Sequence, residues 1–407
     1  MRRRQLLKGM MALPVIGTGM LMRSPLRLSE AQAAATGRKT LVVLFQRGAN
    51  DGLNTVVPFG EDAYYRLRPT LAVARPGRGS GAALNLDGFF GLHPSLAPLH
   101  SLFQQGRLAI MPSVHYPNAT RSHFAGQHLI ESGTTSTSKA DGWLNRYLKA
   151  RKAGLLSGAA FGTSQPFALR GPVSVPTIRE FGGGLGGPRE YQQALSRDLK
   201  AALSQRAGGG NLRLVQSAGL AGLNQVSALH GLSSGGYRPA NGAKYPESDF
   251  GKALANIAQL VKGRQGLEVA TVDTGGWDTH SDQADRQPQR LAELAAGMSA
   301  LYKDLTAFRS ELLILTMTEF GRTAKENASR GTDHGNASAW FALGGGINGG
   351  IYGEWPGLNA GQLYQGRYLA QSIDFRDVMG EVMRRHLQAT DLSSILPGHS
   401  YRPVGFL

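Results

Sequence analysis

Short runs of apolar residues alternate along the chain with longer segments in which apolar residues recur every three or four positions. A short apolar run is typical of a strand buried on both faces, whereas the three-to-four spacing is that of an amphipathic helix. Strands that alternate with helices predict an α/β fold, with a doubly wound, mostly parallel sheet flanked by helices. The predicted strands are residues 40–45, 108–111, 267–272, 312–317 and 340–346, and the main predicted helices are 93–105, 122–131, 141–150, 250–261, 290–308 and 368–387.

The middle of the chain, residues 134–245, interrupts this regular alternation. Glycine clusters at 182–184, 208–210 and 235–236 separate polar segments, and two further helical patterns cover 190–205 and 212–229. We therefore expect a Gly-rich helical insertion or cap that packs over the sheet. At 407 residues the chain fits either one large α/β domain or a core with a subdomain. We place a single domain at residues 38–407.

Polar residues that can carry chemistry gather where predicted strands end. Asp51 follows the first strand after a tight glycine-containing loop, and Glu319 and Arg322 follow the strand at 312–317. Ligands of open α/β sheets lie beyond the carboxyl ends of the strands, so these side chains are expected to share one site. The alternative for each aspartate is a structural turn that its side chain caps. The complete set at strand ends is Asp51, Asp273, Asp278, His280, Glu319, Arg322, Asp333 and His334.

Carboxylates and imidazoles stand close together in two of these clusters. Three carboxylates and His280 lie within residues 273–282, and Asp333 is followed directly by His334. Mixed oxygen and nitrogen ligands suit a divalent cation of the Zn or Mn class, and the sequence leaves Zn, Mn, Mg and Ca open. A solvated acidic turn is the alternative for residues 273–282. We expect metal ligands there, because a histidine and a tryptophan are embedded among the acidic residues.

A further cluster surrounds the start of the helix predicted at 122–131. Ser122 stands at its beginning, between Arg121 and His123, with His115 and His128 nearby in the sequence. Serine at this position most often caps the helix. The same position would also place backbone N–H groups and the positive end of the helix dipole beside a phosphate or sulfate. The sequence leaves both interpretations open.

Amino-acid composition excludes several kinds of chemistry and narrows the expected partners of the protein. The chain has no cysteine, which excludes disulfides, thiolate ligands and a cysteine nucleophile. The body of the chain contains no stretch of about twenty apolar residues, so we expect no transmembrane segment in the mature protein. The net charge of +16 suits an anionic substrate. Because the basic residues form no run with interleaved aromatics, we expect no nucleic-acid partner.

The N-terminus has the pattern of an export signal. Arg3 and Arg4 form a twin-arginine box, a mildly apolar stretch covers residues 10–22, and residues 31–33 offer a small-residue cleavage site. We therefore expect a signal peptide at residues 1–33, the twin-arginine export machinery as a partner, and a periplasmic or extracellular location. Removal of its six basic residues and one acidic residue would lower the net charge from +16 to +11.

Together these blocks resemble the exported twin-arginine proteins of the DUF1501 family, within the alkaline phosphatase and sulfatase-like superfamily. The resemblance spans nearly all of the chain from about residue 38. It is carried by RGANDGLN at 47–54, RSHF at 121–124, GWDTH at 276–280, TEFGR at 318–322 and GTDHG at 331–335.

The resemblance to the superfamily implies roles for individual residues. Asp51, Asp333 and His334 would hold one metal ion, and Ser122 would be the nucleophile. Asp273, Asp278 and His280 are the candidates for a second metal ion, although their spacing departs from the pattern of the superfamily. Further catalytic candidates are Arg121 or Arg322 as a clamp for oxyanions, and Glu319 or His123 as a general acid or base or as a residue that orients a ligand.

Two functions follow from these expectations. The first is an exported metal-dependent hydrolase of phosphate or sulfate esters, acting on an anionic small molecule or an envelope polymer. The second is a non-catalytic binding or assembly protein of the cell envelope on the same fold. A weaker third idea, a carbohydrate or polymer binder, depends on exposure of Trp143, Trp277 and Trp355, although tryptophan is more often buried.

Overall fold

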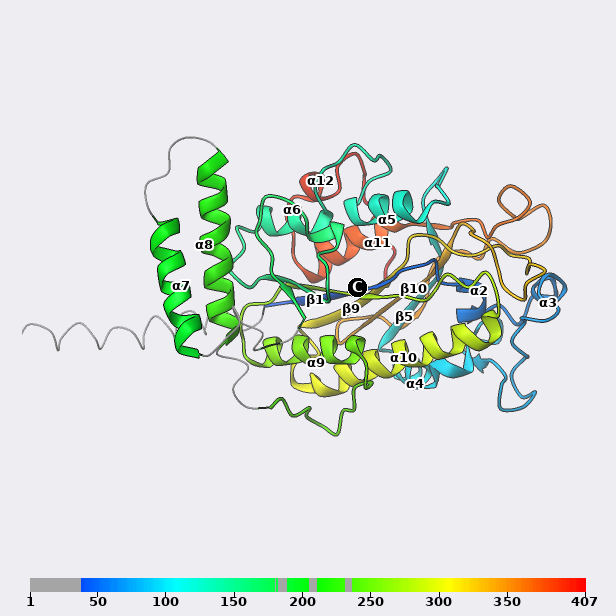
Figure 1. Ribbon diagram of the computed structural model, residues 1–407. Coiled ribbons are helices and arrows are strands. Elements are labelled where there is room, and N and C mark those ends of the chain that lie inside the picture. Colours follow the sequence, from blue (N-terminus) through cyan, green and yellow to red (C-terminus); the bar gives the residue numbers. More distant parts are fainter. Residues whose placement is uncertain (1–37, 180, 182–188, 205–210, 231–235) are drawn as a thin grey trace, which may run out of the picture. The chain divides into compact units, whose positions relative to one another are not determined.

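Strand β1 (Thr40–Gln46) lies in the middle of the main sheet and is buried along its whole length. The computed structural model describes residues 38–179, 181, 189–204, 211–230 and 236–407 (Figure 1). The predicted signal peptide and the glycine clusters at 182–184 and 208–210 lie outside these residues. Residues Lys39–Leu407 form one compact unit.

The main sheet is almost entirely parallel. β1 pairs in parallel with β8 (Val269–Thr274) on one side and with β9 (Leu312–Met317) on the other. Only β10 (Ser338–Gly344) runs against its neighbours in the described part of this sheet. The predicted doubly wound, mostly parallel sheet is thereby confirmed. Its order is β11-β5-β10-β9-β1-β8-β6-β7, with β12 beside β5 (Leu108–His115), where β6 is Gly158–Phe161, β7 Thr177–Ile178, β11 Gly350–Ile351 and β12 Ile373–Asp374.

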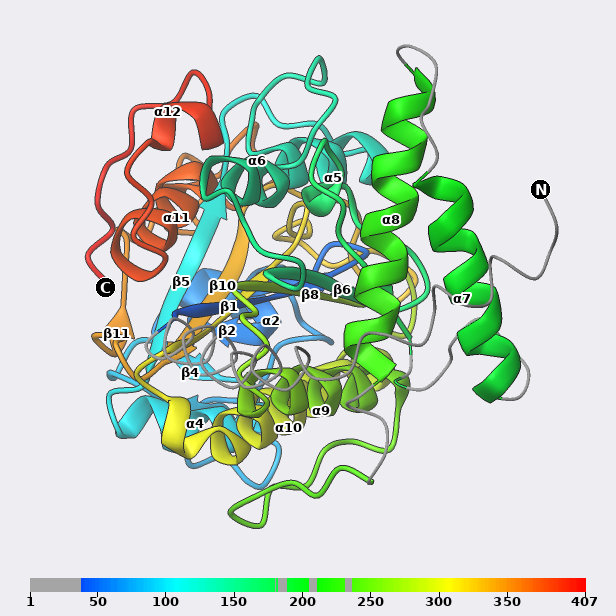
Figure 2. The same cartoon turned by 90° about the vertical axis from the view of Figure 1, so that its left-hand side faces the viewer.

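Helices cover both faces of this sheet, as Figure 2 shows. Alternate side chains of β1 explain why both faces need covering: Leu41 and Val43 belong to one apolar cluster, and Val42 and Leu44 to the other. One face carries α4 (Ala97–Gln104), α9 (Asp249–Lys262) and α10 (Gln283–Asp304), and the other carries α5 (His123–Ser132), α6 (Trp143–Ala150), α11 (Phe375–Glu381) and α12 (Leu392–Ile395).

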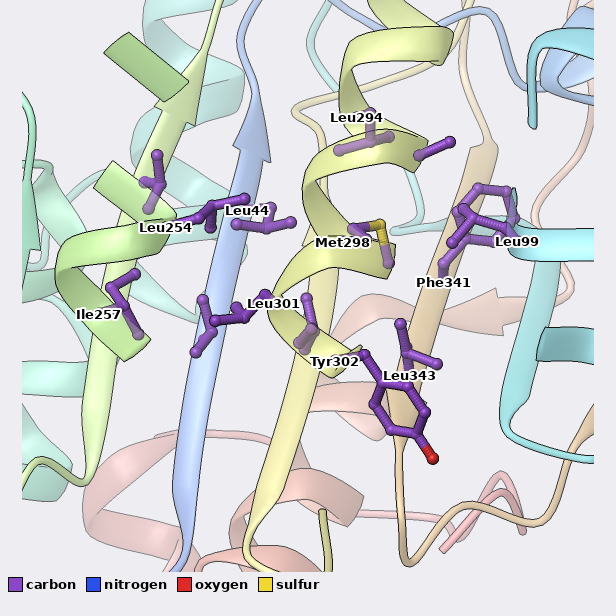
Figure 3. Packing of buried hydrophobic residues seen from close by; sticks show 14 of the residues in the cluster. Leu44, Leu99, Leu254, Ile257, Leu294, Met298, Leu301, Tyr302, Phe341 and Leu343 are labelled. Atoms are coloured by element: carbon purple, nitrogen blue, oxygen red, sulfur yellow. The ribbon is translucent and has the colours of Figure 1, made fainter. Parts of the chain in front are cut away.

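The core on the α9 and α10 side is drawn in Figure 3. Leu254 of α9 and Leu301 of α10 are fully buried and belong to the same apolar cluster as Leu44 of β1. Phe341 of β10 extends this cluster toward α4. Burial of one such side chain contributes roughly 1.5–3 kcal/mol, so this layer holds the strand ends in a fixed arrangement.

Residues 134–245 differ in part from the insertion that the sequence predicts. β6 pairs in parallel with β8, and β7 pairs with β6, so this segment supplies two strands of the main sheet. The strand was missed because its sequence, GAAF, is short and rich in small residues. The two predicted helices are present as α7 (Arg189–Leu203) and α8 (Asn211–His230). Gln225 of α8 donates to the carbonyls of Leu155 and Ser174.

Several boundaries also differ from the prediction. α10 begins at Gln283, seven positions before the predicted residue 290, and β5 continues to His115. Trp143 and Trp277 are buried in the core, which removes two of the three tryptophans from the polymer-binding idea. Among the described residues no helix combines the length and apolar character needed to cross a bilayer.

The remaining described elements are short. A small antiparallel sheet follows β1 in the chain and pairs in the order β2-β4-β3. The elements are α2 (Gly52–Thr55), β2 (Val56–Val57), α3 (Asp62–Leu67), β3 (Leu84–Asn85), β4 (Gly91–Leu92), η2 (Pro94–Leu96), η3 (Phe167–Leu169), η4 (Thr306–Phe308) and η5, a π-helical segment (Val382–His386).

Candidate metal centre

Three loops meet at the carboxyl end of β1, because its two neighbours β8 and β9 run parallel to it. A single side chain, Arg322, fastens these loops together. Its Nη2 donates to the carbonyl of Gly48 at 2.6 Å and to that of Trp277 at 3.0 Å. Its Nε donates to Ala49 O at 2.8 Å and its Nη1 to Thr332 O at 3.1 Å. The buried guanidinium therefore sets the spacing of the loops rather than facing solvent.

The loop after β1 needs its glycine for two reasons. Gly48 has a φ of +118°, a backbone conformation that residues other than glycine rarely adopt. A Cβ at this position would lie 2.6 Å from the backbone nitrogen of Asp278. The close approach brings the loop after β1 against the loop after β8, where Asp278 begins the candidate ligand set.

His123, the first residue of α5, is anchored through one ring nitrogen. Its Nδ1 lies 2.7 Å from Oε1 of the buried Glu319, and its ring stacks on Phe320. The other nitrogen, Nε2, is buried and has no hydrogen-bond partner among the described residues. This Nε2 lies 3.4 Å from Oδ2 of Asp278. A buried nitrogen without a partner beside a carboxylate is an arrangement that a bound cation would satisfy.

His334 is anchored through a backbone carbonyl. Its Nδ1 lies 2.8 Å from the oxygen of Arg121. A carbonyl can only accept, so Nδ1 carries the proton in this contact. Burial lowers the pKa of His334, which favours the neutral ring and leaves a lone pair on Nε2. That atom lies 3.3 Å from Oδ1 of Asp278.

His280 completes the arrangement from the loop after β8. Its Nδ1 lies 3.0 Å from Oδ1 of Asp333, which also accepts from Nδ2 of Asn327. Its Nε2 lies 3.0 Å from both Asp278 Oδ1 and His334 Nε2. Asp333 thus orients the imidazole ring of His280. Its carboxylate contacts the candidate ligand Asp278 only through that ring.

The three imidazole rings share one pattern. Each binds a carboxylate or a carbonyl through Nδ1 and turns Nε2 toward the carboxylate of Asp278, as histidines that ligate metals commonly do. The ligand atoms of His123, Asp278 and His334 all lie within 4.8 Å of one another. Bonds of about 2.0–2.1 Å to a tetrahedral zinc ion separate its ligands by about 3.3 Å. The distances of 3.3–3.4 Å from Asp278 to His123 and His334 fit such an ion. His280 lies outside this group of three, although its Nε2 also lies 3.0 Å from the Asp278 carboxylate.

The electrostatics of Asp278 suit a ligand. Its side chain is 45% exposed. Partial burial opposes its ionisation, but the hydrogen bond from Arg322 and the nearby positive charges lower the pKa of Asp278 below its ordinary value. The carboxylate is therefore charged at neutral pH and contributes one negative charge to a group of three imidazoles.

Asp51, expected to be a metal ligand, lies in a different environment. Its carboxylate is buried and receives two bonds from Arg68, Nη1 to Oδ2 at 2.5 Å and Nη2 to Oδ1 at 2.9 Å. It also accepts from Nε2 of Gln283 and from the backbone of Leu53. The structure therefore gives Asp51 the role of a helix cap and buried ion-pair partner, and it does not bring this residue into the cluster.

Asp273, another expected ligand, also points elsewhere. Its Oδ1 lies 3.0 Å from Nη2 of Arg47. Arg47 makes a second ion pair, at 2.7 Å, with the buried Glu131 of α5. Asp273 is thus tied to a structural network that joins β8 to α5, and the expected second metal set of Asp273, Asp278 and His280 is not assembled.

The remaining expected residues lie around the cluster. Ser122 is the exposed N-cap residue of α5 and makes no capping hydrogen bond with its side chain. The Arg121 guanidinium stacks 4.0 Å from the centre of the Tyr368 ring, and its Nη2 donates to Gln365 at 2.5 Å. Arg322 was expected as an oxyanion clamp, but its donors are occupied by carbonyls and by Asp278. Arg121 therefore remains as the candidate clamp.

The side chains that hold the expected residues in place were not identified from the sequence. Arg68 and Gln283 hold Asp51, and Phe320 supports the ring of His123. His123, expected as a general acid or base or as a residue that orients a ligand, lies in the group of candidate ligands. His280 and His334, expected as ligands from the GWDTH and GTDHG blocks, both lie at the candidate centre.

The chain matches the model of one protein family over residues 237–397, and that family is described as a protein of unknown function, DUF1501. This match covers α9, α10 and the strand ends that carry Asp278, His280 and His334, and over these residues it agrees with the DUF1501 resemblance found in the sequence. No curated protein matches the chain.

Solved structures show a weak likeness over most of the chain. The C-terminal periplasmic domain of EptC from Escherichia coli, in complex with Zn, is 8% identical and has a TM-score of 0.41, covering 90% of this chain and 89% of that one. The lipoteichoic acid synthase LtaP from Listeria monocytogenes is 9% identical with a TM-score of 0.39, covering 91% and 81%. Alkaline phosphatase from the Antarctic bacterium TAB5 is 8% identical with a TM-score of 0.35, covering 86% and 98%.

Proposed function

For a chain whose residues 237–397 match the DUF1501 family, we propose a metal-dependent hydrolase of phosphate or sulfate esters that acts outside the cytoplasm. One observation carries the proposal: three imidazoles anchored through Nδ1 turn toward one carboxylate, directly beside an exposed serine at a helix N-terminus. A metal centre next to a potential nucleophile is the arrangement that ester hydrolysis requires.

The residues that would hold the ion are His123, Asp278 and His334, with His280 as a fourth ligand. Imidazole-rich sets favour zinc, whereas Mg and Ca prefer sets made of oxygen ligands, so we expect zinc before Mn, Mg or Ca. When bound, the ion would supply Lewis-acid stabilisation of the ester oxygens and lower the pKa of a coordinated hydroxyl or water. Glu319, Asp333 and the Arg121 carbonyl fix the orientation of the rings.

Ser122 is the proposed nucleophile. Its hydroxyl is free of a capping bond, so the first N–H groups of α5 are available to the non-bridging oxygens of the ester. Ser122 Oγ forms a bond to phosphorus or sulfur while the ester oxygen leaves with a proton. Water then cleaves the seryl ester, returns a proton to Oγ and releases phosphate or sulfate. Arg121, adjacent in the chain, would bind the transferred oxyanion through its remaining N–H groups.

The second candidate is a non-catalytic binding or assembly protein of the cell envelope. The placement of Asp51 against Arg68 and of Asp273 against Arg47 supports it, because neither carboxylate is available for a second ion. A single-metal centre can be catalytic, so we rank the hydrolase first. Both candidates place the mature chain in the periplasm or outside the cell, after export by the twin-arginine machinery.

Elemental analysis combined with one variant tests the hydrolase. Ser122→Ala is expected to abolish hydrolysis of 4-nitrophenyl phosphate and 4-nitrophenyl sulfate while retaining stoichiometric metal. Ser393→Ala removes another exposed hydroxyl and serves as the matched control. A protein that binds metal but hydrolyses neither ester nor a wider ester panel would support the binding protein. A protein that takes up none of Zn, Mn, Mg or Ca would exclude the mechanism proposed here.

A further inference from the structure

A cavity of about 210 Å³ lies beside the candidate metal centre. It is formed by the chain after β9 and by the segment before β12, which run antiparallel to each other through a bridge between Thr323 and Tyr368. Its wall includes Leu67, Thr323, Lys325, Asp333, Leu363 and Arg367. Nothing in the proposed mechanism uses this space.

The cavity and the metal centre are connected through the Asp333 carboxylate and the His280 ring. Asp333 lines the cavity, and its Oδ1 lies 3.0 Å from Nδ1 of His280. On the opposite side of the same ring, Nε2 lies 3.0 Å from Asp278. A molecule with one group at the centre can therefore place a second group, a few bonds away, in the cavity.

The acidic and polar groups in the wall are already bound within the protein. Glu326 accepts from the backbone nitrogens of Thr70 and Leu71. The Asp333 carboxylate accepts from Asn327 as well as contacting His280. The Asn327 side-chain oxygen in turn accepts from two backbone nitrogens of its own loop. These carboxylates are held by donors and are not free to bind a cation in the cavity.

The two cationic side chains of the wall differ from the carboxylates because both are open to solvent. Lys325 and Arg367 are exposed and keep their ammonium and guanidinium groups open to solvent. The pKa of the Asp333 carboxyl group is lowered by its hydrogen bond to the imidazole ring and also by an electrostatic interaction with Arg367 across the wall. Leu67 and Leu363 line the same cavity and add apolar surface. Two cations beside two leucines suit an anionic group attached to a small organic body.

The wall is also held in place from behind. Arg68, buried against Asp51, donates from Nη2 to the carbonyl of Thr323 at 2.9 Å and from Nε to that of Ala324 at 3.0 Å. A cavity whose wall is fixed by a buried ion pair loses little conformational freedom when a ligand binds. This feature distinguishes the cavity from a chance gap between surface loops.

We propose that this cavity is a subsite for a second anionic group of the substrate, recognised by Lys325 and Arg367. The substrate would then be a phosphate or sulfate ester that carries another sulfate, phosphate or carboxylate close to the scissile bond. The identification of the ligand as substrate rests on the proposed function, whereas binding of an organic anion in the cavity does not.

Calorimetry on the full mature chain tests the subsite without relying on catalysis. Metal-free protein is titrated with benzenesulfonate at low ionic strength, because salt screens such contacts. We expect saturable binding that weakens at least about tenfold in Lys325→Ala and in Arg367→Ala, the loss typical of one charge-assisted hydrogen bond. The double variant Arg78→Ala/Lys149→Ala removes two positive charges, as many as Lys325→Ala/Arg367→Ala, from exposed positions outside the cavity wall and is expected to bind like the unmodified chain.

The outcomes separate the subsite from the proposed function. Absence of saturable binding, or equal binding by the cavity variants and the control, would overturn the subsite even if the protein hydrolyses simple esters. In zinc-loaded protein we expect benzene-1,3-disulfonate to bind more tightly than benzenesulfonate, and the advantage to vanish in Lys325→Ala/Arg367→Ala. If the cavity binds benzenesulfonate but the protein takes up no metal, the anion site stands and the hydrolase is rejected.

Discussion

Oε1 of Glu319 lies 2.7 Å from Nδ1 of His123, and this contact joins the end of β9 to the first residue of α5. Glu319 is fully buried and also accepts from the backbone of Gly48 and from Gln127. Burial opposes its ionisation, yet the hydrogen bonds from His123 and Gln127 lower the pKa of Glu319. The same hydrogen bond raises the pKa of His123. Glu319 is therefore a charged group that positions a ligand.

Replacing this buried carboxylate tests its positioning role. Glu319→Gln retains the shape of the side chain but removes the negative charge that holds Nδ1–H of His123. We expect zinc affinity to fall about 10–100-fold, the range seen when the partner of a ligating histidine is changed. Competition with a chromogenic chelator measures this affinity. Glu61→Gln alters a carboxylate that binds Trp355 and is the control, and equal affinities for the two variants would contradict the role of Glu319.

Removal of the metal is expected to lower the thermal stability of the protein. A ligand that binds only the folded state stabilises it by about 2.7 kcal/mol at a hundred times its dissociation constant. Differential scanning calorimetry with zinc and with excess chelator should therefore give two different values of Tm. In His334→Ala the two values should coincide, because a ligand is missing. A chelator-sensitive Tm in that variant would place the metal elsewhere.

Asp51→Asn separates a structural aspartate from a metal ligand. The substitution leaves the guanidinium of Arg68 buried without its countercharge, and breaking one partner of a buried pair costs about 3–5 kcal/mol. We expect a lower free energy of unfolding in urea but unchanged zinc stoichiometry in the folded variant. Loss of zinc from a variant that is folded by circular dichroism would return Asp51 to the ligand set.

His386 is expected to make the stability of the protein depend on pH. It is buried, and its Nε2 lies 3.1 Å from the carbonyl of Thr40. Burial lowers the pKa of His386 to about 4, below its ordinary value of about 6.5. Between these values the unfolded chain binds the proton first, so the free energy of unfolding falls as pH drops from about 6.5 to about 4. The slope from one such group approaches about 1.4 kcal/mol per pH unit.

Urea unfolding of metal-free protein between pH 4 and pH 7 checks this dependence. Chelation keeps the histidines of the metal centre from binding zinc, and comparison with His386→Gln isolates the contribution of one group. The variant is expected to lose less stability on acidification than the unmodified chain. Parallel curves for the two proteins would show that another group titrates.

The sequence was sufficient for the central strands of the sheet and for the end at which the polar residues gather. The apolar runs before Asp51, Asp273 and Glu319 are the parallel neighbours β1, β8 and β9, so their ends had to meet. The sequence did not reveal which side chains form hydrogen bonds or ion pairs with those residues. Arg68 binds the carboxylate of Asp51, which lies 17 positions away in the sequence, and Glu319 contacts His123, which lies 196 positions away. Pairings of that kind depend on how the chain packs, and local spacing does not encode them.

Arg322 has a consequence for any attempt to move this centre to another protein. Its guanidinium binds the carbonyls of Gly48 and Ala49 in one loop and those of Trp277 and Thr332 in two others, and it also holds the carboxylate of Asp278. A graft of the ligands alone onto a foreign scaffold would leave those loops at unrelated distances. The smallest transferable unit is the ligand set together with this arginine and the glycine that lets the loops touch. Arg322→Lys, with one nitrogen in place of three, would be expected to loosen the whole centre at once.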